Sequence, residues 1–188
     1  MKAAAIGLCG PHRTGKTTLA KAFAADANIP FLVTSTSTVF ARHGLDPAAP
    51  MDFGTRLFIQ DKVLDAAVEV WRDAGAEQWI TDRTPLDMLM YTLADIQGGT
   101  EAEPAVVAKY AARCFQATAD IFDRLVLVQP GIPLAHEPGK AALNPAFIEH
   151  LSALLLGLCH SEENSVPVRV IPRMVLDLSE RVALVRGT

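Results

Sequence analysis

A glycine-containing segment near the start of the chain constrains the fold more than any other feature. From Gly10 to Thr17 the chain reads Gly-Pro-His-Arg-Thr-Gly-Lys-Thr, which fits the pattern G-x-x-x-x-G-K-[ST]. The segment follows an apolar run over residues 3–9 and precedes a stretch with helical periodicity. Such a loop points backbone N–H groups and the start of a helix at one place, where they bind phosphate. The sequence therefore predicts a strand, a phosphate-binding loop and a helix in succession.

Each side chain of this loop has an expected task. Lys16 is expected to reach the terminal phosphates of a nucleoside triphosphate, and the Thr17 hydroxyl to be a ligand of Mg²⁺. ATP and Mg²⁺ are accordingly the predicted cofactors. The residues predicted to surround the nucleotide are Gly10, Pro11, His12, Arg13, Thr14, Gly15, Lys16, Thr17 and Thr18.

Strand and helix patterns alternate along the 188 residues, of which 50% are hydrophobic. Strands are predicted at about 3–9, 30–34, 77–81, 124–129 and 168–172. Helices are predicted near 16–26, 52–74, 85–97, 102–119, 145–160 and 178–186. This alternation predicts one α/β domain over residues 1–188, with a five-stranded parallel sheet between two layers of helices.

Charge and cysteine content exclude several classes of protein. The net charge of −4 argues against a general nucleic-acid binder. Cys9, Cys114 and Cys159 are far apart in the sequence and have apolar neighbours. We therefore expect reduced core thiols and neither a disulfide framework nor a zinc site. Because no apolar run approaches about 18 residues, we expect no membrane partner and a soluble cytoplasmic protein, in the host cytoplasm if the protein is viral.

A carboxylate is expected beside the phosphate loop because phosphoryl transfer needs Mg²⁺ to be positioned by an acid. Asp82 ends the apolar run of the third predicted strand, and in parallel sheets ligands bind at the carboxyl ends of strands. Asp82 is therefore the predicted second metal ligand. Arg83 follows as a fixed cation that can hold a phosphate.

These segments together resemble the nucleoside and nucleotide kinases of the P-loop kinase group. The resemblance rests on the phosphate loop, on Asp82 and Arg83, and on the Pro- and Gly-rich segment 130–143 after the fourth predicted strand, which corresponds to a lid. It implies a three-layer P-loop kinase fold and an acceptor bound between lid and core. In that family an arginine just beyond the last strand lies over the adenine, and here it would be Arg173.

The loop is similar to that of thymidylate kinases, which place a catalytic arginine three positions before the lysine. The resemblance assigns this role to Arg13, which would stabilise charge on the transferring phosphoryl group. The segment 130–143 contains no arginine, in agreement with those relatives. His12 stands where they have an acid that contacts the acceptor, so the identity of the acceptor stays open.

Candidate acceptor-binding residues follow the second predicted strand and lie in the helices beyond it. They are Thr34, Ser35, Thr36, Arg42, Arg56 and Arg113. Nucleoside kinases typically carry an acid after this strand, whereas the chain has hydroxyl groups there. This difference favours an acceptor that already carries a phosphate.

Three functions remain open on the sequence. The first is a kinase for a nucleoside, a nucleotide or a related pyrimidine. The second is a kinase of the same group that phosphorylates 5-hydroxymethyluracil within DNA, using a local groove of Arg42, Arg56, Arg83 and Arg113. The third is a switch ATPase, which the arginine after Asp82 disfavours. The long helix near 52–74 could also pair two copies as a homodimer.

Overall fold

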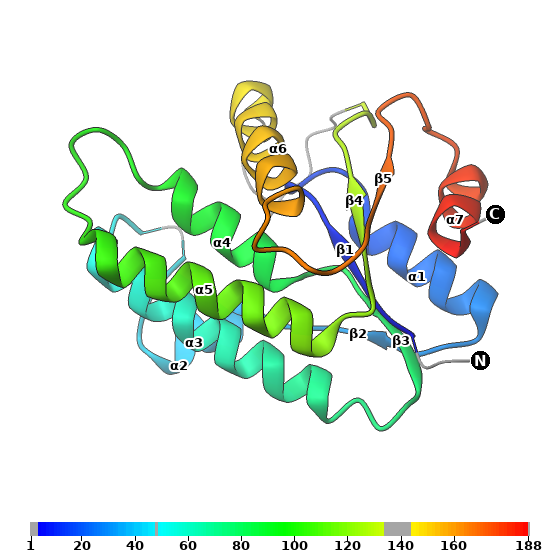
Figure 1. Ribbon diagram of the computed structural model, residues 1–188, viewed down its shortest axis with the longest axis horizontal. Helices are drawn as coiled ribbons and strands as arrows, with labels where there is room; N and C mark the ends of the chain where they lie inside the picture. Colours follow the sequence, from blue (N-terminus) through cyan, green and yellow to red (C-terminus); the bar gives the residue numbers. More distant parts are fainter. Residues whose placement is uncertain (1–3, 48, 134–143, 188) are drawn as a thin grey trace.

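Five parallel strands form the centre of the molecule. The computed structural model describes residues 4–47, 49–133 and 144–187 (Figure 1). The strands are β1 (Ala4–Cys9), β2 (Phe31–Leu32), β3 (Gln78–Thr81), β4 (Arg124–Val128) and β5 (Val168–Ile171), in the order β2-β3-β1-β4-β5. Each neighbouring pair is parallel. The predicted five-stranded parallel sheet is confirmed.

Helices cover both faces of this sheet. On one face lie α1 (Lys16–Ala27) and α7 (Leu178–Arg186), and on the other α3 (Phe53–Arg72), α4 (Pro85–Ala94), α5 (Pro104–Ile121) and α6 (Pro145–Cys159) (Figure 1). Alternate residues of the central strand, β1, point into the hydrophobic cores on the two faces of the sheet. Ile6 and Leu8 pack with the α1 and α7 side, while Ala5 and Cys9 pack with the α4 and α6 side. The three-layer prediction is therefore also confirmed.

The sheet register determines where the site forms. β1 lies between β3 and β4, and Gly7 is the partner of Thr81 at the end of β3. The segment after Cys9 and the residue after Thr81 consequently leave the same edge of the sheet. This register brings Asp82 next to the phosphate loop.

One short helix, α2 (Thr36–Arg42), was not predicted. The Ser35 side chain accepts a hydrogen bond from Thr38 N and begins this helix. Only Val39 and Phe40 are buried within it. This helix has only seven residues and one buried pair, and hydroxyl side chains occupy its first turn, so the sequence shows no helical periodicity there.

Several further expectations can be compared with the structure. Cys9, Cys114 and Cys159 are buried free thiols, as predicted. The predicted lid over 130–143 falls mainly on 134–143, which lie outside the described residues.

Within the described part of the chain, no helix combines the length and the apolar character that crossing a bilayer requires. The homodimer through the helix now bounded as α3 stays a prediction.

Gly7 tests how tightly β1 packs beside the site. A methyl carbon added there would lie 2.6 Å from Thr84 Cγ2 and 3.0 Å from Phe122 Cδ1. Because Thr84 is fully buried, Gly7→Ala should lower the free energy of unfolding by about 1–3 kcal/mol in urea denaturation. Gly98→Ala is the matched control, since its added carbon meets nothing within 4 Å. Equal stability of the two variants would contradict the packing described.

Candidate active site

The phosphate loop begins where β1 ends. Gly10 N donates a hydrogen bond of 2.9 Å to Asp87 Oδ1, and a Cβ at Gly10 would lie only 2.6 Å from the carbonyl oxygen of Val128. Gly15 has a φ of 80° and forms the N-cap of α1. The first glycine is therefore required by close approach to β4, and the second by a left-handed backbone.

Lys16 lies at the first position of α1 and reaches back under the loop. Its Nζ donates to the carbonyl oxygen of Gly10 and, at 2.8 Å, to that of Pro11. Burial lowers the pKa of this ammonium, and the nearby Asp87 carboxylate opposes that shift. The positive charge of Lys16 is thus held inside the phosphate loop, against the carbonyl oxygens of Gly10 and Pro11.

The two predicted metal ligands are in contact. Thr17 Oγ1 donates a hydrogen bond to Asp82 Oδ2, although the residues come from α1 and from the end of β3. A hydroxyl and a carboxylate are ligands that Mg²⁺ accepts, and Mg²⁺ sites are commonly completed by substrate phosphates and water. No group of three or more His, Cys, Asp or Glu side chains suited to a metal occurs among the described residues. The chemistry of the pair, one hydroxyl and one carboxylate, fits two ligands of a Mg²⁺ ion.

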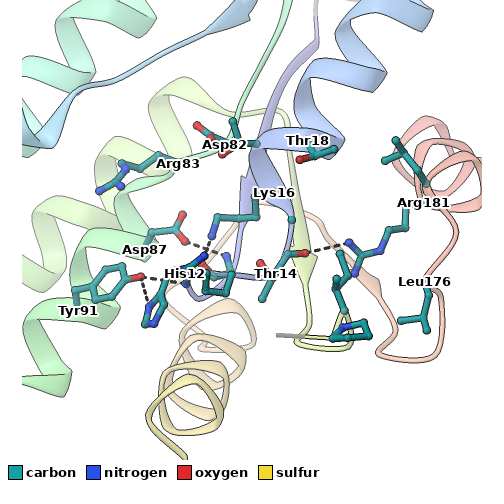
Figure 2. Close-up of a pocket in the computed structure, with 17 residues that line it drawn as sticks. His12, Thr14, Lys16, Thr18, Asp82, Arg83, Asp87, Tyr91, Leu176 and Arg181 are labelled. Atoms are coloured by element: carbon teal, nitrogen blue, oxygen red, sulfur yellow. Dashed lines mark hydrogen bonds between the residues drawn. The ribbon is translucent and has the colours of Figure 1, made fainter. Parts of the chain in front are cut away.

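A cavity of about 640 Å³ surrounds these groups. Figure 2 shows two regions on either side of the loop. The polar lobe contains Arg83, Asp87, Tyr91 and His12, and the α7 lobe contains Leu176 and Arg181. Of the residues predicted for the nucleotide, metal and catalysis, those that line the cavity are Gly10, His12, Arg13, Thr14, Gly15, Lys16, Thr17, Thr18, Asp82 and Arg83. The structure therefore brings most of the predicted site together.

Asp87 links helix α4 to the phosphate loop. It is 3% exposed, and its Oδ2 accepts hydrogen bonds of 2.8 Å from both the backbone N and the Oγ1 of Thr84. Burial raises the pKa of this carboxyl, while the Lys16 ammonium lowers it. Asp87 is also the acid of a capping box with Thr84 at the start of α4. Its bond to Gly10 was not predicted.

His12 and Tyr91 form a second link between the loop and α4. Tyr91 Oη lies 3.2 Å from both the backbone N and the Nδ1 of His12, and the two rings stack. Burial raises the pKa of Tyr91 to about 12. The His12 pKa is lowered, first by burial and then by the charges of Lys16 and Arg13. These shifts favour a neutral imidazole and a protonated phenol at pH 7.

The predicted acceptor loop lies beside the polar lobe. Arg83 Nη1 donates a hydrogen bond of 2.8 Å to Thr36 Oγ1. Ser35 caps α2, and the Thr34 hydroxyl oxygen is buried with no hydrogen-bond partner among the described residues. None of the three hydroxyl residues lines the cavity itself.

Four predicted arginines do not line this cavity. Arg56 Nε pairs with Asp95 at 3.2 Å, and Arg113 bridges Asp61 and Asp65 of α3. Arg173 makes two hydrogen bonds of 2.6 Å to the Glu149 carboxylate, and Arg42 is exposed in the last turn of α2. Of the four arginines predicted to form a common groove, Arg42, Arg56, Arg83 and Arg113, only Arg83 lines this cavity, and acids on neighbouring helices engage Arg56 and Arg113.

Arg181 of α7 was missed in the sequence. It is 1% exposed, and its Nε and Nη1 donate to the carbonyl oxygens of Val175 at 2.9 Å and Thr14 at 3.0 Å. It shares the inward face of α7 with Val185, four residues later. The four-residue spacing from Val185 could have indicated that Arg181 faces inward. An arginine at such a position is not expected, because inward-facing helix positions normally carry apolar residues.

These features define a class of protein. A parallel sheet in the order found and a phosphate loop between β1 and α1 define the P-loop kinase fold, and the contact between Thr17 of α1 and Asp82 after β3 lies at its site. Residues 5–135 match the family model described as AAA domain. Because this match covers more than half of the chain, the protein belongs to this family. A comparison with curated protein sequences finds no match.

Solved structures share the fold at low identity. Deoxyadenosine kinase from M. mycoides with bound dATP is 14% identical, with a TM-score of 0.66 over 98% of this chain and 97% of that one. Thymidylate kinase from Candida albicans is 10% identical, with a TM-score of 0.64 over 97% and 88%. NadR protein in complex with NR is 13% identical, with a TM-score of 0.69 over 98% of this chain and 50% of that one. The predicted resemblance to P-loop kinases is confirmed for the fold.

His12 makes stability depend on pH. Because its pKa lies below the ordinary value of 6.5 in the folded state, the unfolded chain takes up this proton first as the pH falls. The free energy of unfolding of the wild type, relative to His12→Gln, should therefore decrease from about pH 7.5 to about pH 5.5 in urea denaturation. The exposed His160, replaced by Gln, is the control. A difference that stays constant with pH would contradict the environment described for His12.

Proposed function

We propose that the protein is an ATP- and Mg²⁺-dependent phosphotransferase acting on a nucleoside or nucleotide. One observation carries this proposal: the Thr17 hydroxyl meets the Asp82 carboxylate inside the cavity that Lys16 enters. Fold similarity to deoxyadenosine and thymidylate kinases supports the same reaction type. It also supports a small nucleotide as the partner.

The loop residues have distinct parts in the proposed reaction. Thr17 and Asp82 would hold Mg²⁺, which supplies charge neutralisation on the phosphates when bound. Lys16 exchanges the carbonyl oxygens of Gly10 and Pro11 for phosphate oxygens and stabilises the charge that develops on them. Arg13 lines the same cavity with a left-handed backbone, φ 67°, and would add a second cation at the transferring group.

The polar lobe favours an acceptor that carries its own phosphate. Both carboxylates that line the described cavity are already engaged, Asp82 by Thr17 and Asp87 by Gly10 and Thr84. A hydroxyl acceptor needs a general base, whereas a phosphate is already nucleophilic. Arg83 supplies a cation at this lobe. We therefore infer a nucleoside monophosphate as the acceptor class.

Neither rival function gains support from the arginines. A DNA acceptor carrying 5-hydroxymethyluracil was expected to use Arg42, Arg56, Arg83 and Arg113, and of these only Arg83 lines the cavity. A switch ATPase would release phosphate without transferring it. One label-transfer assay distinguishes both of these functions from the proposed one.

The assay follows label from γ-labelled ATP with Mg²⁺ into nucleoside monophosphates, nucleosides, and DNA with and without 5-hydroxymethyluracil. Label should appear in the nucleoside diphosphate formed from one of the monophosphates, and Lys16→Ala should reduce this transfer at least ~100-fold because it removes charge stabilisation in the transition state. Lys21→Ala is the control, since Lys21 is exposed on the same helix. Phosphate release without a labelled acceptor, or full activity in a folded Lys16→Ala protein, would overturn the proposal.

A further inference from the structure

Arg181 is a buried cation with an unused donor nitrogen. Only 1% of the residue is exposed, and it lines the cavity from the α7 side (Figure 2). Its Nε and Nη1 are satisfied by the carbonyl oxygens of Val175 and Thr14, but its Nη2 has no hydrogen-bond partner among the described residues. Burial alone lowers its pKa, with no contribution from a nearby carboxylate. The guanidinium is therefore desolvated without a compensating anion in the described part of the chain.

Four other arginines among the described residues differ from Arg181, because a carboxylate engages each of them. Arg56, Arg113, Arg173 and Arg186 each pair with an aspartate or glutamate. Arg186 is especially informative because it lies on the same helix and pairs with Asp26. Burial of an unpaired charge costs free energy, so a protein retains such a group where an anionic ligand compensates it.

The position of Arg181 indicates what that ligand is. Nη1 bonds Thr14 O, and a Cβ added at Gly15 would lie 3.2 Å from the same nitrogen. The guanidinium thus touches the loop directly before Lys16. The neighbouring walls of the cavity, Ile132 and Leu176, are apolar and suit the faces of a base, not a charge.

We propose that Arg181 binds the phosphate chain of the donor nucleotide, with Nη2 as the donor group and Thr14 O as the contact that keeps the guanidinium against the loop. The phosphate chain neutralises the buried charge on binding. This assignment rests on nucleotide binding at the phosphate loop, which the proposed function also requires. It adds a cation from α7 that the sequence motif does not contain.

Equilibrium binding of ADP with Mg²⁺, measured by calorimetry, tests the assignment. Arg181→Lys keeps the charge, Arg181→Gln keeps a hydrogen-bond donor without the charge, and Arg181→Met keeps neither. We expect the Gln and Met variants to bind ADP at least ~10-fold more weakly than the wild type, and the Lys variant to retain most of the affinity. Arg186→Met, on the exposed side of α7, is the matched control and should bind ADP as the wild type does.

Other results would overturn the assignment. Wild-type affinity in Arg181→Gln, or equal losses in all three variants, would indicate a structural hydrogen bond rather than charge recognition. If Arg181→Met does not fold, the comparison of Gln with Lys decides the question. Because the readout is binding, ADP affinity that depends on the Arg181 charge without any phosphoryl transfer would refute only the kinase proposal. Transfer with unaltered ADP affinity in the variants would refute only the role of Arg181.

Discussion

The arrangement of the site depends on the buried carboxylate of Asp87. One of its oxygens accepts the N–H of Gly10, at the start of the phosphate loop, and the other accepts two hydrogen bonds from Thr84, at the start of α4. The same carboxylate lowers the electrostatic cost of burying the Lys16 ammonium nearby. One side chain thus sets the position of the loop, the beginning of a helix and the charge balance of the lysine. Because Asp87 is committed to these contacts, it is unsuited to act as a general base.

The sheet supplies the rest of the geometry. Parallel pairing of β1 with β3 places Asp82 beside the first turn of α1, where the Thr17 hydroxyl meets it. The loop has cationic groups on both sides, with Arg83 in the polar lobe and Arg181 in the α7 lobe. A polyanion that enters this cavity therefore meets positive charge from Lys16, Arg83 and Arg181, which come from three separate parts of the chain.

Sequence reasoning found the strands and the phosphate loop because both follow from local patterns. Apolar runs marked the strands, and the loop motif placed Lys16 and Thr17 at the start of α1. The register of a parallel sheet was sufficient to bring Asp82 to them. Local patterns could not reveal the hydrogen bond from Gly10 N to Asp87, because the two residues are 77 positions apart in the sequence.

The arginines show the limits of local patterns most clearly. Arg113 was expected at the acceptor site, but Asp61 and Asp65, one turn apart on α3, engage it across the α3–α5 contact. Conversely, the sequence pattern assigned no role to Arg181, and only its burial against Thr14 relates it to the site. The partner of a long cationic side chain depends on how helices pack, and that packing has no short-range sign in the sequence.

The central claim is that Thr17 and Asp82 hold a divalent cation beside the phosphates of a nucleotide. The most direct test is a crystal structure with Mn²⁺, which replaces Mg²⁺ and is located by its anomalous scattering, together with a non-hydrolysable ATP analogue. We expect one Mn²⁺ ion between Thr17 Oγ1 and Asp82, with Lys16 Nζ moved from the carbonyl oxygens of Gly10 and Pro11 to the phosphates. A nucleotide bound elsewhere, or Mn²⁺ that contacts neither Thr17 nor Asp82, would contradict the account.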